Sequence, residues 1–200
     1  MGVTTLLTDP HPCRHIVYPY TDEEKGINAV YLFASSGLSK GESVVLIMAD
    51  ARSEPITRRL ASGGFDPGAL RASGQLECVS ADSLLHEFIQ SGTLCEPLVK
   101  DTIGRFIARA RAGSLNRKVR VFGEMVSLLL ARNEVALAER LEGLWNEIID
   151  EHSISLLCTY TLLDSGFTTL PDSLIKLHSH NLGSQPVERD SSAQTAAGND

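Results

Sequence analysis

Short apolar runs of strand length alternate along this chain with longer segments in which apolar residues recur at helical spacing. The runs predict five strands, at residues 15–20, 43–49, 75–79, 118–122 and 154–162. The longer segments predict helices at residues 21–36, 54–62, 84–90, 97–111, 126–130 and 134–151. This alternation predicts a three-layer α/β fold, in which a doubly wound, mainly parallel central sheet carries helices on both faces.

Several local signals fix where the predicted helices begin and end. Thr21 to Glu24 reads TDEE, a capping box in which the Thr21 hydroxyl would accept an N–H at the start of a helix. Gly37 is a natural stop for the same helix. Residues 66–74 are rich in turn-forming residues, so we expect an irregular connector there.

The segment from Gly37 to Leu60 places a strand, a loop and a helix where nucleotide-binding folds cradle a phosphate. A working phosphate loop needs flexible glycines, a lysine for the phosphate charges and a Ser or Thr hydroxyl for Mg²⁺. The predicted loop instead reads DARSEP, from Asp50 to Pro55, and lacks all three. We therefore expect this loop to form a stiff rim at a ligand-binding edge.

Composition and charge narrow the class of protein. The chain has 200 residues of which 42% are apolar, enough for one domain with a full core. We divide it into an N-terminal lead (1–14), the domain (15–182) and a disordered polar tail (183–200). The formal net charge of −7 argues against nucleic acid as a direct partner. No signal peptide or membrane-spanning run is found, which predicts a cytoplasmic protein.

Polar and aromatic residues follow the predicted strands, and in a parallel sheet they would converge on one crevice at the strand ends. They are Tyr18, Tyr20, Asp50, Arg52, Glu54, Glu124, Met125, Tyr160 and Thr161. Taken singly, such a residue is more often an ordinary surface charge or core aromatic than a functional group. As a set they favour a ligand crevice.

Two charged residues lie within or just after a buried strand and need partners there. Arg120 is surrounded by Val119, Val121 and Phe122, and Glu124 follows at the strand end. They could recognise a ligand. They could equally form a structural ion pair, with each other or with Glu142.

The histidines and cysteines give weaker signals. His15 opens the first strand, and Cys158 would point from the last strand into the core as an inert thiol. His178 and His180 are two residues apart and have no third ligand nearby in the sequence, so we expect no metal site. No nucleophile motif is present, and no cofactor is expected.

An ordered set of motifs resembles one known family. The motifs are HIVYPYTDEE, GLSKGESVVLIMA, VRVFGEM, LCTY and LHSH, which together span about residues 15–180. They are similar in order and spacing to the MEDS domain, a sensory domain named for methanogens, methylotrophs and the dichloromethane-responsive regulator. The resemblance implies a RecA-like fold, related to circadian-clock ATPases, that has lost its phosphate loop.

The resemblance also implies a function. Such domains are thought to sense small hydrocarbon derivatives without catalysis, in bacterial or archaeal signal transduction and transcription regulation. The implied partners are a small organic ligand and a histidine kinase, an anti-sigma factor or a DNA-binding regulator. A homodimer is also compatible. The residues that match family motifs are His15, Tyr18, Gly41, Glu42, Arg120, Glu124, Cys158 and Tyr160.

Combining the motif matches with the strand-end residues gives nine predicted ligand-binding residues: His15, Tyr18, Tyr20, Arg52, Glu54, Arg120, Glu124, Cys158 and Tyr160. Two other functions stay open. One is a degenerate nucleotide-binding ATPase, with Glu124 as the acid and Arg52 as the phosphate contact. The other is an interaction module whose crevice holds a partner peptide.

Overall fold

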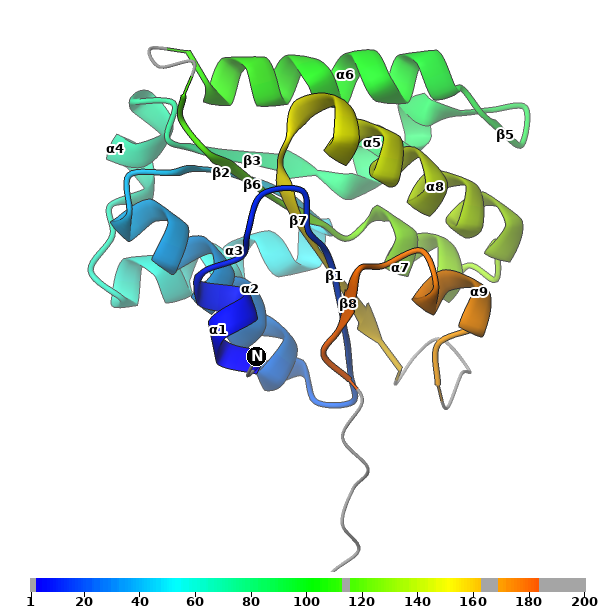
Figure 1. Cartoon of the computed structure of the whole chain (residues 1–200), viewed down its shortest axis with the longest axis horizontal. Coiled ribbons are helices and arrows are strands. Elements are labelled where there is room, and N and C mark those ends of the chain that lie inside the picture. The colour runs from blue at the N-terminus through cyan, green and yellow to red at the C-terminus, as the bar shows by residue number, and fades with distance from the viewer. Residues whose placement is uncertain (1–2, 113–115, 163–168, 184–200) are drawn as a thin grey trace, which may run out of the picture.

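A computed structural model of the chain describes residues 3–112, 116–162 and 169–183. Its centre is a six-stranded sheet in the order β3-β2-β6-β7-β1-β8, and all the pairings are parallel (Figure 1). The strands are β1 (His15–Tyr20), β2 (Ser43–Met48), β3 (Leu76–Ser80), β6 (Val119–Gly123), β7 (Ser155–Thr161) and β8 (His180–Asn181). The predicted α/β fold with a mainly parallel sheet is confirmed.

The central strands β2 and β6 are apolar except for Ser43 and Arg120, because helices cover both of their faces. Every residue of β2 is buried, and so is every residue of β6. The register places Leu46 beside Phe122, and Phe122 in turn beside Leu157 of β7. Successive residues point to opposite faces, so each strand contributes to two separate cores.

One face of the sheet is covered by α1 (Val3–Thr8), α2 (Glu23–Ser39) and α3 (Asp50–Ser62), with α4 (Pro67–Ala72) beside β3 (Figure 1). The even-numbered residues of β1 and β2 pack here, together with Phe33 and Ile56. The predicted N-terminal lead is thus partly ordered, because α1 packs against α2 and buries Leu6 and Leu7.

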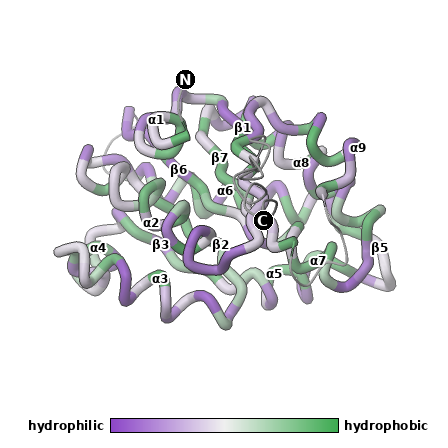
Figure 2. Tube along the Cα trace, turned by 90° about the horizontal axis from the view of Figure 1, so that it is seen from below, coloured by the Kyte–Doolittle hydropathy of each residue, from purple (hydrophilic) through white to green (hydrophobic). Residues whose placement is uncertain are grey.

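The other face is covered by α5 (Ala81–Phe88), α6 (Glu96–Ala110), α7 (Met125–Ala131), α8 (Val135–His152) and α9 (Asp172–Ile175). The alternate strand residues and Trp145 form this larger core. In Figure 2 the central strands are mostly hydrophobic, whereas the outer helices mix both classes. Among the described helices, none is long and apolar enough to cross a lipid bilayer.

Several predicted boundaries are wrong, each for a local reason. The α3 helix begins at Asp50, so the predicted rim loop from Asp50 to Pro55 is its first turns. Pro55 lies within α3 and has no N–H to donate to the carbonyl of Ala51, an exposed residue one turn earlier. The cap of α2 is Asp22, which accepts the N–H of Glu24, and the Thr21 hydroxyl is not its cap.

Short elements account for the remaining differences. The predicted connector at 66–74 contains α4, because Asp66 caps the N–H groups of Gly68 and Ala69. The helices α1 and α9, the strand β8 and the antiparallel pair β4 (Ile89–Gln90) and β5 (Thr93–Leu94) were not predicted. They carry too few residues to show a period. The predicted disordered tail lies outside the described residues, apart from Gly183.

Candidate functional site

A group of charged and aromatic side chains lies at the carboxyl ends of β1, β2 and β6, and all but the exposed Glu23 are buried. We call Tyr20, Glu23, Arg52 and Glu124 the Arg52 cluster. Arg52 donates through Nη1 to Glu124 and lies 3.0 Å through Nε from Oε1 of Glu23. Its guanidinium carbon lies 5.3 Å from the centre of the Tyr20 ring. Arg52 therefore joins the end of β1 and the starts of α2, α3 and α7.

The start of α3 is occupied by the chain's own carboxylates. The N–H of Ala49 donates to Oε2 of Glu124 at 2.8 Å, and the N–H of Asp50 donates to Oδ2 of Asp82 at 3.1 Å. A helix N-terminus after a parallel strand is the usual place for a bound phosphate, because its N–H groups and dipole attract anions. Here Glu124 and Asp82 take that place.

Close packing against α2 holds the Arg52 cluster rigid. A Cβ at Gly26 would lie 2.7 Å from the Tyr20 ring and 2.9 Å from Nη2 of Arg52, so only glycine fits. Burial raises the pKa of Tyr20 well above its usual value, although the charge of Arg52 partly opposes the shift. Tyr20 therefore stays a neutral hydroxyl beside a charged pair.

Gly26→Ala is expected to destabilise the domain by about 1–3 kcal/mol, because the new methyl group displaces the Tyr20 ring and Arg52. Gly143→Ala in α8 is the matched control, since a Cβ there meets nothing within 4 Å. The control should stabilise the protein by roughly 0.5–1 kcal/mol through helix propensity. Urea unfolding measures both changes. Equal effects of the two alanines would show that the packing around Gly26 is loose.

Glu54 and Tyr18, both predicted from the strand ends, are not part of the Arg52 cluster. Glu54 is exposed on α3 and pairs with Arg58 one turn later. Tyr18 is half-buried on the same face of the sheet as Tyr20, with ring centres 6.4 Å apart. The expected convergence of all the strand-end residues on one crevice therefore does not occur.

Arg120 has partners other than the two we expected. It pairs through Nε with Glu42, and neither Glu124 nor Glu142 is its partner. Its Nη1 and Nη2 atoms donate to four more oxygens, three of them backbone carbonyls, on Leu7, Thr8, Phe33 and Ser36. All three guanidinium nitrogens are therefore engaged by the protein, and they hold α1 against α2.

A second polar cluster is buried on the opposite face of the sheet, beneath α8. We call His15, Glu142, Cys158, Tyr160 and His178 the Glu142 cluster. Nε2 of His15 lies 3.0 Å from Oε2 of Glu142 and 3.5 Å from Sγ of Cys158. Nε2 of His178 lies 3.5 Å from Oε1 of Glu142, and the hydroxyl of Tyr160 donates to the same oxygen.

Burial and charge act against each other in the Glu142 cluster. Burial alone would raise the pKa of Glu142, but His15 and His178 hold it below its usual range. Burial raises the pKa of the Cys158 thiol, and the carboxylate of Glu142 raises it further. In the absence of a cation in the cluster, Cys158 is therefore a neutral thiol, as the sequence predicts for an inert core cysteine.

Comparisons with known families and solved structures assign the chain to a family and a fold. A family model described as the methanogen/methylotroph, DcmR sensory domain (MEDS) matches residues 14–178. The chain belongs to the MEDS family. A search of curated proteins finds no match to this MEDS domain. The recognition made from the motifs is confirmed.

The fold of this MEDS domain is similar to that of KaiC-like proteins. One solved structure, a KaiC-like protein from the hyperthermophilic archaeon Pyrococcus horikoshii OT3, superposes with a TM-score of 0.61 at 15% identity. The match covers 84% of this chain and 68% of that chain. The expected RecA-like fold is confirmed, and a likeness at this identity shows the fold alone.

The MEDS domain brings six of the nine predicted site residues together in two groups of three and leaves the other three apart. Tyr20, Arg52 and Glu124 meet at the carboxyl edge, whereas His15, Cys158 and Tyr160 meet beneath α8. The residues left apart are Tyr18, Glu54 and Arg120. The partners that the prediction omitted are Glu23, Glu142 and His178. Glu142 could have been found from the sequence, because it is a carboxylate among the apolar residues on the buried side of α8.

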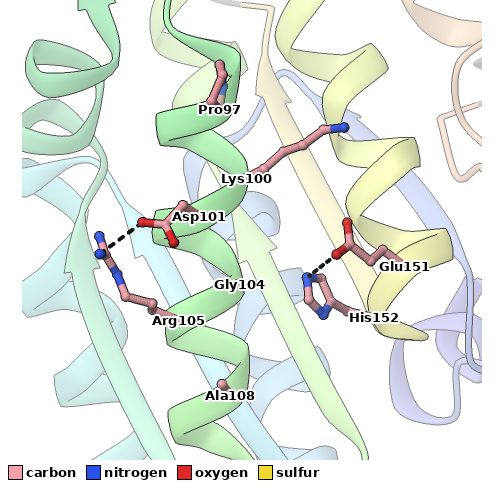
Figure 3. Close-up of a pocket in the computed structure, with 8 residues that line it drawn as sticks. All are labelled: Pro97, Lys100, Asp101, Gly104, Arg105, Ala108, Glu151 and His152. Carbon is pink, nitrogen blue, oxygen red and sulfur yellow. Dashed lines mark ion pairs between the residues drawn. The ribbon is translucent and has the colours of Figure 1, made fainter.

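One open hollow lies on the surface of the MEDS domain, between α6 and α8 (Figure 3). Its lining residues are Pro97, Lys100, Asp101, Gly104, Arg105, Ala108, Glu151 and His152. The charged residues here pair with neighbours, as in the 2.9 Å contact between Arg105 and Asp101. No predicted site residue lines this hollow.

Proposed function

We propose that this MEDS domain is a non-catalytic sensor that binds a small hydrocarbon-derived molecule at the carboxyl edge of its sheet, beside the Arg52 cluster. Family membership supports the sensory role. The location follows the general rule that α/β sheets bind ligands at the carboxyl ends of their strands. The proposal adds to the family assignment a class of ligand and the position of its binding site.

The observation that carries the proposal is the use of Glu124 and Asp82 as internal anions at the start of α3. A nucleotide phosphate would have to displace both carboxylates, so the edge favours a ligand without phosphate. Nη2 of Arg52 is buried and has no hydrogen-bond partner among the described residues. An oxygen or halogen atom on a small organic molecule could accept from this donor.

The Arg52 cluster also suggests how binding would reach a signalling partner. Arg52 joins four elements, so a ligand that competes for its donors would shift the starts of α2 and α7 relative to β1. The partners that fit the family resemblance are a histidine kinase, an anti-sigma factor or a DNA-binding regulator. The whole chain would then act as a module in bacterial or archaeal signal transduction.

A thermal-shift screen tests the proposal. The probes are alcohols, aldehydes, carboxylates and halides of one to four carbons, with Mg-ATP in parallel. A true ligand at 100 times its Kd should raise the unfolding midpoint by about 5–10 °C. We expect Arg52→Lys to abolish the shift and Arg58→Lys on the exposed side of α3 to retain it.

Two results would contradict the proposal. If no organic probe shifts the midpoint, the sensor site is wrong. If Mg-ATP binds more tightly than millimolar and Arg52→Lys removes that binding, the domain is a degenerate nucleotide-binding protein. Isothermal titration with Mg-ATP separates the two cases.

A further inference from the structure

We propose that His15, Glu142, Cys158 and His178 bind one transition-metal ion, zinc by the chemistry of its donors, in the core beneath α8. This inference is independent of the proposed ligand site, which lies at the carboxyl edge around Arg52. The four residues come from β1, α8, β7 and the segment after α9. These residues are too far apart in the sequence to be recognised as a metal-binding motif, and the fold brings them together.

The distances fit a tetrahedral ion. One ligand atom from each residue can be chosen so that all four lie within 4.8 Å of one another. Zinc lies about 2.0–2.3 Å from nitrogen, oxygen and sulfur ligands, so tetrahedral ligand atoms are about 3.3–3.8 Å apart. Nε2 of His15 lies 3.0 Å from Oε2 of Glu142 and 3.5 Å from Sγ of Cys158, close to that range, and Nε2 of His178 lies 3.5 Å from the other carboxylate oxygen of Glu142. Small side-chain adjustments would centre an ion.

Both histidines are oriented as metal ligands by their other ring nitrogen. Nδ1 of His178 lies 2.8 Å from the carbonyl oxygen of Leu174, which can only accept, so Nδ1 carries the proton. Nδ1 of His15 lies 2.9 Å from Oδ1 of Asn146. The amide of Asn146 is fixed because its Nδ2 donates to the carbonyl of Leu177 at 3.0 Å. Such contacts are typical of metal-bound histidine, and they leave each Nε2 lone pair facing the centre.

The centre of the cluster therefore contains more hydrogen-bond acceptors than hydrogen-bond donors. Nε2 of His178 and Oε2 of Glu142 are buried and have no hydrogen-bond partner among the described residues. Oε1 of Glu142 receives the Tyr160 hydroxyl, which leaves Oε2 directed toward His15. Lone pairs that face one another in a buried site require a cation between them, either a metal ion or an extra proton on a histidine.

The donor set selects the ion. Two imidazoles, one thiolate and one carboxylate suit zinc, whereas magnesium and calcium prefer oxygen ligands alone. Zinc binding would release the Cys158 thiol proton to solvent. The 2+ ion would then balance the thiolate and the Glu142 carboxylate. Four protein ligands leave no open position, so the ion would be structural, tying the segment that carries His178 to the sheet.

Metal analysis of the purified full chain tests the inference. We expect one equivalent of zinc per chain, lost after treatment with a chelator in mild denaturant and regained on refolding with zinc chloride. Refolding with cobalt chloride instead should give the visible absorption of tetrahedral Co²⁺ and a thiolate-to-cobalt charge-transfer band. Zinc should also raise the unfolding midpoint. A chain that refolds fully but binds neither ion would overturn the inference in favour of a protonated histidine.

Matched variants locate the ion. Cys158→Ser should abolish the charge-transfer band, whereas Cys95→Ser, outside the cluster, should retain it. His178→Asn should abolish zinc binding, whereas His180→Asn two residues away should retain it. Asn146→Ala removes the contact that positions His15 and the bond to the Leu177 carbonyl but no metal ligand, and it should weaken zinc binding about 10–100-fold. Equal losses in the members of either matched pair would overturn the assignment of the ligands. Circular dichroism of each variant confirms that it is folded.

Discussion

Arg120→Met is expected to lower the free energy of unfolding by about 3–5 kcal/mol, among the largest effects of any single change in this domain. Arg120 is 2% exposed and pairs with Glu42, whose side chain is 12% exposed. Methionine fills much of the volume but leaves the Glu42 carboxylate without its partner. It also leaves the carbonyls of Leu7, Thr8 and Phe33 without this donor.

Urea unfolding followed by circular dichroism measures this loss. Arg105→Met is the control, because Arg105 pairs with Asp101 at the surface and should change stability little. Adding Glu42→Gln to Arg120→Met should recover part of the loss, since it removes the unpaired charge. A loss below about 1 kcal/mol for Arg120→Met would show that the contacts of Arg120 with Glu42 and α1 contribute little to stability.

Glu124→Leu is expected to cost a similar amount, about 3–5 kcal/mol, because it leaves the buried Arg52 guanidinium without its main partner. It also removes the acceptor for the N–H of Ala49 at the start of α3. The double variant Arg52→Met with Glu124→Leu should be more stable than Glu124→Leu alone, because no charge is then left buried without its partner.

The unfolding midpoint in urea measures these differences as a double-mutant cycle. Glu54→Gln is the matched control, since this exposed carboxylate also pairs with an arginine of α3. The control should leave the midpoint nearly unchanged. If both acidic residues gave the same small effect, the Arg52 cluster would be an ordinary surface network.

The fold was predictable where local signals are strong. The strand at 15–20 has the predicted bounds, and the predicted helix at 134–151 is displaced by only one residue. A continuous apolar run covered by helices on both sides can hardly be anything other than a central strand. At the β2–α3 junction the strand and the helix were predicted, but the loop expected at Asp50 to Pro55 is the first part of α3.

The partners within each cluster could not be predicted, because they depend on which face of the sheet a residue occupies. His15 and Tyr20 lie on one strand, yet they belong to different clusters on opposite faces. Arg120 and Glu124 are four residues apart, yet Arg120 reaches back to α1 and Glu124 reaches across to α3. The sequence shows that a buried charge needs a partner, but only tertiary packing selects it.

The way in which Arg120 holds α1 has a consequence for how this family is recognised. Arg120 donates to the main-chain oxygens of Leu7 and Thr8 at the end of this helix. Every amino acid has such an oxygen. Such a contact does not depend on the side chains of α1, of which Leu6 and Leu7 are buried. The family model begins at residue 14, after this helix. The packed domain therefore extends beyond the residues that the family model matches, because Arg120 holds α1 in place from within them.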